Sequence, residues 1–287
     1  MKNIPVIALM FALAAFTAVT ITGCKDKKKD EPPDDPGTSK KNVGKVGGGS
    51  LEELKAEIGA TISGAVKFKG TPPAMEDDER ISKSSDKNFC ESGMGIHVKK
   101  QTWLVNSDGT VKNVLVFLTP PKGKKFAALN PESNPHAKKL VNDQPFCQFV
   151  PHVFGVQSDL TPVVFKNSAA VAHNVKIDIN PTLGDSINKT LGPKEESSEY
   201  KFKSKGALVL DMTCSSHGWM AAKIGVFDHP YFAVTDDKGN FEIKNAPVGV
   251  DLVVHYWHES FGGLNEKKGL SGKSYTKGDN KVDIELP

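Results

Sequence analysis

Short runs of apolar, β-branched and aromatic residues dominate the chain from Thr61 onward, and Gly, Pro, Asn and Asp separate them. Within several runs apolar and polar residues alternate, which is typical of strands with one buried face. The strands predicted on this basis are residues 62–68, 102–105, 111–118, 161–165, 173–179, 207–214, 222–227, 241–244 and 252–257. Because no long amphipathic helical pattern lies between these runs, the sequence predicts an all-β fold with one or two β-sandwiches.

The residues before the first predicted strand carry a helical signal instead. Ser50 is followed three residues later by Glu53, and this spacing fits a capping box, in which both side chains bond backbone N–H groups of the first helical turn. We therefore expect a short helix from Ser50 to about Ile58.

The N-terminal residues have the pattern of an export signal. Lys2 precedes an apolar run that ends near Ala18, and small residues stand directly before Cys24. This arrangement resembles a bacterial lipobox, which implies that residues 1–23 are a signal peptide and that the thiol of Cys24 becomes lipidated. A transmembrane anchor is the alternative, but the apolar run is shorter than the roughly 20 residues that a helix needs to cross a bilayer.

Lipidation of Cys24 predicts a location as well as an anchor. The chain is expected to be exported and attached to the cell membrane or the outer membrane, facing the periplasm or the exterior. Residues 24–49 mix charge, proline and glycine with very few apolar side chains, so they cannot bury enough surface to fold. They are expected to form a disordered tether.

Composition sets broad limits on the rest. The chain has 287 residues, of which 38% are hydrophobic, and a formal net charge of +3. This length fits one large domain or two ordinary ones, and the apolar fraction is enough for a packed core. The net charge is too small to indicate a nucleic-acid partner.

Cys214, His217 and Met220 lie in one short loop and offer a thiolate, an imidazole and a thioether. Soft sulfur ligands beside imidazole select copper, and two His with one Cys and a distant axial Met make the electron-transfer type of copper site. Alternate residues of a strand share a face, so Cys214 lies on the apolar face of strand 207–214. Met220 has the parity of the apolar positions in 222–227. Both sulfur side chains are therefore expected to point into a core.

His173 is the upstream histidine that matches this arrangement. In the predicted strand 173–179 it belongs to the apolar face, whereas Asn174 belongs to the polar face. A lone histidine on such a face is more often a core residue, but together with the Cys214 loop His173 is the expected second imidazole ligand.

The strand 163–167 that ends in Asn, the pair His173 and Asn174, and the Cys-x-x-His-x-x-Met loop together resemble the cupredoxin family. The similarity is to its small blue-copper, amicyanin- and plastocyanin-like members, and it covers roughly residues 148–228. It implies a Greek-key β-sandwich at residues 141–228 that binds one type 1 copper. The ligands implied by the resemblance are His173, Cys214, His217 and Met220.

Two residues beside these ligands have open interpretations. Asn174 either pins the ligand loop through hydrogen bonds, as residues around metal ligands commonly do, or is an ordinary turn residue. Trp219 either contributes to an apolar docking patch for a redox partner or covers the metal from water.

Cys90 and Cys147 remain once Cys24 is assigned to lipid and Cys214 to metal. In an exported protein such a pair favours a disulfide. The alternative places Cys147 with His152, or Cys90 with His97, at a second metal site.

A second β-sandwich is expected around the first. Residues 232–249 and 251–257 resemble the end of a carboxypeptidase regulatory-like, transthyretin-like sandwich, with Asp-Lys-Gly at a hairpin turn and Pro-x-Gly before the last long strand. Its beginning would lie in 62–73 and 114–118. The copper domain would then be inserted into a split sandwich formed by residues 50–140 and 229–287.

The resulting hypothesis is a lipid-anchored type 1 copper protein that carries single electrons between a donor and an acceptor protein of the cell envelope. It is not expected to be an enzyme, because the assigned ligands leave no coordination position for a substrate. Two alternatives remain: a non-redox β-sandwich binding module, and a copper-handling or nitrosocyanin-like protein.

Overall fold

The structure is a computed structural model that describes residues 51–93, 95–261 and 269–287. The chain divides into two units, Met1–Gly48 and Gly49–Pro287, and the described residues belong to the second. The predicted signal peptide, the predicted lipidation site Cys24 and the predicted tether therefore lie outside the described residues. Among the described residues, no helix has the length and apolar character needed to cross a membrane.

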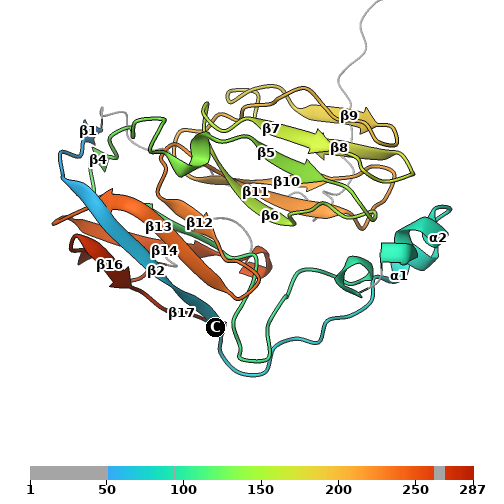
Figure 1. The fold of residues 1–287 in the computed structure, drawn as a ribbon, viewed down its shortest axis with the longest axis horizontal. Coiled ribbons are helices and arrows are strands. Elements are labelled where there is room, and N and C mark those ends of the chain that lie inside the picture. Colours follow the sequence, from blue (N-terminus) through green and yellow to red (C-terminus); the bar gives the residue numbers. More distant parts are fainter. Residues whose placement is uncertain (1–50, 94, 262–268) are drawn as a thin grey trace, which may run out of the picture. The chain divides into compact units, whose positions relative to one another are not determined.

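The described residues confirm the all-β prediction, since strands in several sheets dominate the chain (Figure 1). One sandwich has a five-stranded sheet in the order β6-β11-β10-β8-β9 and a two-stranded parallel sheet, β5-β7. Its strands are β5 (Leu140–Asp143), β6 (Val153–Gln157), β7 (Val163–Lys166), β8 (His173–Ile177), β9 (Ile187–Leu191), β10 (Leu208–Thr213) and β11 (Ala221–Phe227). One buried cluster fills the space between the two sheets, and it includes Phe165, Ile177, Met212 and Ile224.

The other sandwich combines strands from both ends of the described chain. One sheet has the order β12-β3-β14-β15, and the other has the order β13-β2-β16 with β17 also paired to β2. Its strands are β2 (Ile58–Phe68), β3 (Leu115–Thr119), β12 (Phe232–Val234), β13 (Asn240–Pro247), β14 (Asp251–Trp257), β15 (Lys273–Ser274), β16 (Gly278–Lys281) and β17 (Ile284–Leu286). Strands before residue 120 thus pair with strands after residue 231 around a separate core that includes Ile62, Val116, Phe241 and Val254.

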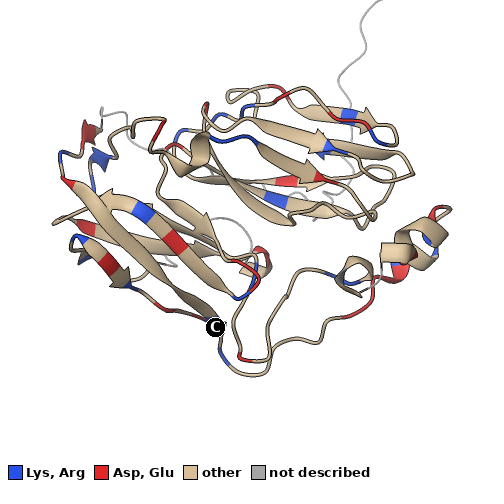
Figure 2. Cartoon of the chain, in the orientation of Figure 1, with Lys and Arg blue, Asp and Glu red and all other residues tan. Residues whose placement is uncertain are grey.

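Charged residues are mixed on both sandwiches. Figure 2 shows Lys and Arg interspersed with Asp and Glu along the strands, as expected for a chain with a net charge of +3.

A segment of short helices lies between β2 and β3 in the sequence. It contains α1 (Glu79–Ser82), α2 (Lys87–Cys90) and two 3-10 helices, η1 (Glu91–Gly93) and η2 (Gly95–Val98). Ile81 of this segment is buried in the core of the first sandwich. A disulfide between Cys90 and Cys147 joins the segment to that sandwich covalently.

The helix expected from Ser50 to Ile58 is wrong. Residues Glu52–Glu53 form β1, which pairs in parallel with β4 (Lys124–Lys125), and β2 begins at Ile58. The backbone N–H of Leu54 donates to the carbonyl of Lys125 at 2.8 Å, and its side chain is buried in the second core. So short a helix gains too few hydrogen bonds to offset nucleation, and burial of Leu54 decides the conformation.

The strand expected at 102–105 is also wrong. Of these residues, Val105 makes an isolated bridge to Val111. The other predicted strands correspond to observed ones, with ends that differ by a few residues.

Candidate metal centre

Three of the predicted ligands converge at one end of the first sandwich. His173 is the first residue of β8, Cys214 directly follows β10, and His217 lies in the loop between β10 and β11. The Nδ1 atoms of His173 and His217 are 3.0 Å apart, and the Sγ atom of Cys214 is 3.8 Å from Nδ1 of His217. All three side chains are buried, and their ligand atoms lie within 4.8 Å of one another.

Met220 lies in the same buried corner. The β10–β11 pairing continues into the loop, because the N–H of Cys214 donates to the carbonyl of Met220 at 3.2 Å. The N–H of Met220 donates to the carbonyl of His217 at 2.8 Å. Met220 is 1% exposed and belongs to the same core as Cys214. These bonds close the loop tightly and bring the two sulfur residues opposite each other at the strand ends.

Asn174 contacts the ligand loop through its backbone and its side chain. Its N–H donates to the Sγ of Cys214 at 3.3 Å, and its Oδ1 accepts from the N–H and hydroxyl of Ser215 at 3.3 and 3.1 Å. Its Nδ2 donates to Oδ1 of Asn188 on β9 at 2.9 Å. These are the contacts that its interpretation as a loop-pinning residue requires.

The electrostatics favour an ionised cysteine. Burial raises the pKa of the Cys214 thiol, but hydrogen bonds from His173, His217 and the N–H of Asn174 outweigh burial and lower the pKa to about 5. Burial lowers the pKa of His217, but its contacts with Cys214 and Asp86 outweigh this effect and raise it. At neutral pH the centre therefore offers a thiolate.

The donor set fits copper. A thiolate and two imidazoles combine soft and borderline ligands, which suits both Cu(I) and Cu(II). The Nδ1 atoms face each other, so both imidazoles can present the same nitrogen to one ion. Cys214 is free of any disulfide, and Nε2 of His173 is buried with no hydrogen-bond partner. His173 is therefore held by packing, with Nδ1 directed at the other two ligands.

Sequence reasoning missed Asp86. Its Oδ2 lies 3.0 Å from Nε2 of His217, on the ring edge opposite the Cys214 thiolate. The two residues are 131 positions apart in the sequence, and Asp86 stands in a short-helix segment without strand or helix periodicity. No local pattern in the sequence could have indicated this contact.

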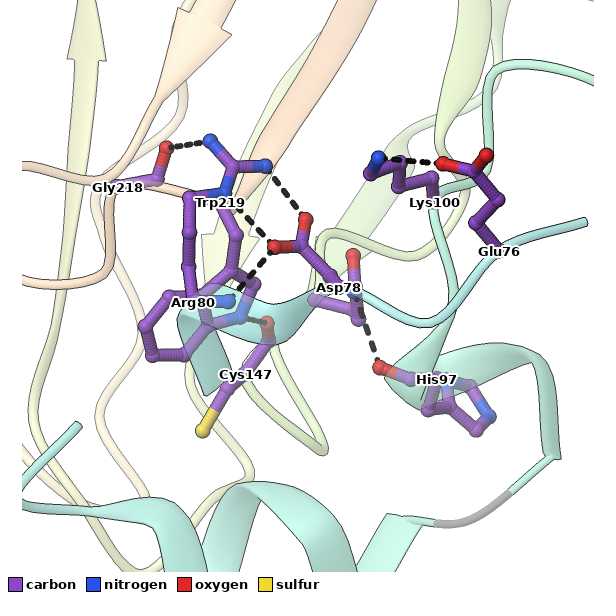
Figure 3. A network of polar contacts seen from close by, with 9 residues as sticks. Glu76, Asp78, Arg80, His97, Lys100, Cys147, Gly218 and Trp219 are labelled. Atoms are coloured by element: carbon purple, nitrogen blue, oxygen red, sulfur yellow. Dashed lines mark hydrogen bonds and ion pairs between the residues drawn. The ribbon is translucent and has the colours of Figure 1, made fainter. Parts of the chain in front are cut away.

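Trp219 and the disulfide lie beside the ligand loop. The Nε1–H of Trp219 donates to the carbonyl of Cys147 at 3.1 Å (Figure 3). Trp219 is 8% exposed, so the structure favours the covering role over the docking patch. The sulfurs of Cys90 and Cys147 are bonded to each other, so the alternative in which they bind a second metal with His97 or His152 is wrong. Nε2 of His152 instead contacts Glu259 at 2.7 Å.

Neither a protein family model nor a curated protein matches the chain. The solved structures that resemble part of it are cupredoxins. One is a copper-containing nitrite reductase from Thermus scotoductus, at 20% identity and a TM-score of 0.27, which covers 31% of this chain and 22% of that chain. A Cu(I) form of an amicyanin variant has 18% identity and a TM-score of 0.27, over 38% of this chain and 97% of that chain. A purple cupredoxin from Nitrosopumilus maritimus has 21% identity and a TM-score of 0.24, over 30% of this chain and 97% of that chain.

Proposed function

We propose that the chain is a type 1 copper protein that carries single electrons. The observation that carries the proposal is the buried convergence of the Nδ1 atoms of His173 and His217 with the Sγ of Cys214. Met220, at the opposite end of the same short loop, would offer its thioether to the ion. A trigonal arrangement of two His and one Cys with a distant Met is the ligand set of electron-transfer copper sites.

The chain's own residues do three things at this centre. Cys214 and the two histidines bind the ion, and the N–H of Asn174 donates to the Cys214 sulfur, which is one of the contacts that tune the reduction potential. The surrounding apolar cluster excludes water. When bound, copper supplies a one-electron couple, and a rigid ligand set keeps rearrangement between its two oxidation states small.

The location and partners are part of the proposal. A lipid on Cys24 would attach the chain to an envelope membrane, with a redox donor and acceptor protein facing the periplasm or the exterior. The protein is proposed to be a carrier and not an enzyme, because His173, Cys214, His217 and Met220 would together occupy the coordination positions of the ion.

The test is the visible spectrum of the full chain loaded with Cu(II). We expect one copper per chain and an intense band from thiolate-to-copper charge transfer, which Cys214→Ser abolishes. Ser216→Ala, a change at an exposed position of the same loop that removes no ligand, should keep the band. Bound zinc without any visible band in the parent protein would support the binding-module alternative instead. A solvent ligand on the copper would support the nitrosocyanin-like alternative.

A further inference from the structure

The ligand His217 is covered by a segment remote in sequence. We call residues 77–98 the cover segment; it contains α1, α2 and both 3-10 helices. His217 is 1% exposed although it lies in a surface loop between β10 and β11. Two residues of the cover segment contact the ligand loop directly, Asp86 at His217 and Arg80 at Gly218. A third contact, at Trp219, comes from Cys147, which is bonded to Cys90 of the segment.

The first contact is a carboxylate on the imidazole edge that faces away from the metal ligands. Oδ2 of Asp86 lies 3.0 Å from Nε2 of His217, while Nδ1 of His217 faces His173 and Cys214. A neutral imidazole carries one N–H, and a carboxylate accepts it, so Asp86 fixes the proton on Nε2. In the neutral ring Nδ1 then carries no proton, so it is the nitrogen available as a ligand.

The second contact fixes the neighbouring backbone. The Arg80 guanidinium donates through Nη1 to the carbonyl of Gly218 at 2.9 Å, and through Nε to the carboxylate of Asp78 at 2.8 Å (Figure 3). Asp78 is 6% exposed and also accepts from the backbone N–H of Arg80. Arg80 is thus held in place from within the cover segment while it binds the loop.

The third contact reaches the ligand loop through the disulfide. The N–H of Cys90 donates to the carbonyl of Asp86 at 3.0 Å, within the turn that begins α2. Cys90 is bonded to Cys147, whose carbonyl accepts from the Nε1–H of Trp219. The sulfurs of this disulfide lie within 4.8 Å of a His217 nitrogen. The position of Asp86 is therefore tied to the ligand loop through the disulfide.

We propose that Asp86 is a positioning residue for the copper ligand His217, and that the Cys90–Cys147 disulfide holds it in that position. The inference rests on the proposed copper function. Asp86 sets the tautomer and orientation of His217, and the cover segment closes the ring edge that would otherwise meet water. Breaking the disulfide takes two electrons and two protons from an external dithiol, which itself becomes a disulfide. It releases Cys90 at the end of α2, the short helix whose N-cap is Asp86.

The test of Asp86 uses the full chain with Asp86→Ala. Carboxylates that hold metal-binding histidines are typically worth roughly 10- to 100-fold in metal affinity, and we expect a loss of that size in copper affinity. In the metal-free protein, at a pH high enough for His217 to be neutral, side-chain ¹⁵N spectra should show its proton on Nε2, and Asp86→Ala should mix the two tautomers. Asp86→Asn keeps an oxygen acceptor and should restore most of the tautomer preference.

Asp77→Ala is the matched control. Asp77 is a carboxylate of the same segment, but it pairs with Lys99 and not with the ligand loop. It should change neither the copper affinity nor the His217 spectrum. If Asp86→Ala also leaves both unchanged in a protein that binds copper, the positioning role is wrong. If the parent protein binds no copper, the proposed function fails, whereas the tautomer measurement still decides the role of Asp86.

The disulfide is tested with the double variant Cys90→Ser and Cys147→Ser. If the disulfide acts by holding Asp86, this variant should bind copper about as weakly as Asp86→Ala, and adding Asp86→Ala to it should cost little more. Residues that act as one unit give such non-additive effects, whereas independent sites add. If the losses in copper affinity are fully additive, or if the Cys90→Ser and Cys147→Ser variant binds copper as tightly as the parent, the disulfide does not act by holding Asp86.

Discussion

At the scale of single residues, Asn174 joins the ligand-bearing strand to the ligand loop. Its backbone N–H donates to the Cys214 sulfur, and its side chain accepts from Ser215 and donates to Asn188. The backbone contact persists whatever side chain stands at this position. The side-chain contacts can therefore be removed alone, which makes their contribution to the loop measurable.

Asn174→Ala should loosen the loop without removing a ligand. The lost hydrogen bonds are partly buried and Ser215 is exposed to water, so we expect a loss of about 1 kcal/mol in the free energy of unfolding. The copper band should shift as the geometry at Cys214 relaxes. Urea denaturation of the metal-free protein and the visible spectrum of the loaded protein measure the two effects.

Asn188→Ala is the control for that variant. It removes the partner of the Asn174 amide nitrogen but leaves both bonds to Ser215. The stability loss should be smaller and the copper band unchanged. An equal shift of the band in both variants would contradict a specific role for the Ser215 bonds.

At the scale of elements, strand periodicity predicted the part of the centre that β-strands build. His173 begins β8, and Cys214 and Met220 flank the β10–β11 turn, as their parity in the sequence indicated. This worked because side chains alternate strictly along a strand, so an apolar face in the sequence is a buried face in the fold. The loop spacing between the two sulfur residues then follows from the hairpin.

In the cover segment and near Ser50, no strand periodicity indicated the observed structure. Helices of four residues, such as α1 and α2, show no periodicity, and they are held by the disulfide and by tertiary contacts. At residues 50–58 the local capping pattern was present, but pairing with β4 overrode it. In both cases long-range contacts decide the conformation, and a single sequence does not reveal them.

Gly225 of β11 tests how closely the first sandwich packs on its neighbours. A Cβ atom at this position would lie 2.8 Å from the ring of Phe227 and 2.9 Å from Leu115, both fully buried. Gly225→Ala should therefore overpack the core and lower the free energy of unfolding by about 1–3 kcal/mol. Thermal and urea denaturation measure the change.

Gly272→Ala is the control, since its Cβ would meet Val253 at an ordinary 3.7 Å. It should leave the free energy of unfolding nearly unchanged. If the Gly225 variant is as stable as the parent protein, the neighbouring side chains can move to accommodate the added methyl group and the overpacking prediction is wrong.

At the scale of the whole described chain, a third buried cluster connects strands of both sandwiches. It consists of Leu115, Phe117, Val153, Phe227, Phe232 and Trp257. Two histidines lie beside it, of which His229 is buried and His136 is partly buried. The ring of His136 stacks on Phe232 with centroids 3.7 Å apart, and Nδ1 of His229 accepts from the N–H of Tyr231. Protonation of either imidazole would place a positive charge among aromatic side chains.

Because of these two histidines, we expect the free energy of unfolding to decrease in mild acid. Burial lowers the pKa of His136 to about 4, and burial together with the neighbouring His136 lowers the pKa of His229 to about 3. In the unfolded chain both have pKa values near 6.5. Between about pH 6.5 and 4 the unfolded chain therefore binds protons that the folded chain does not. The free energy of unfolding decreases as the pH is lowered through this range.

The size of the effect follows from proton linkage. Each histidine contributes a slope of up to about 1.4 kcal/mol per pH unit in that window, and the contribution of His136 levels off below about pH 4, where the folded state also takes up its proton. Urea denaturation of the metal-free chain from pH 7 to 4 measures the slope. His136→Gln and His229→Gln should each reduce the slope of the free energy of unfolding against pH relative to the parent protein. This reduction separates the two histidines from the other titrating groups of the chain. A slope unchanged by either substitution would mean that His136 and His229 take up protons in the folded protein as readily as in the unfolded chain.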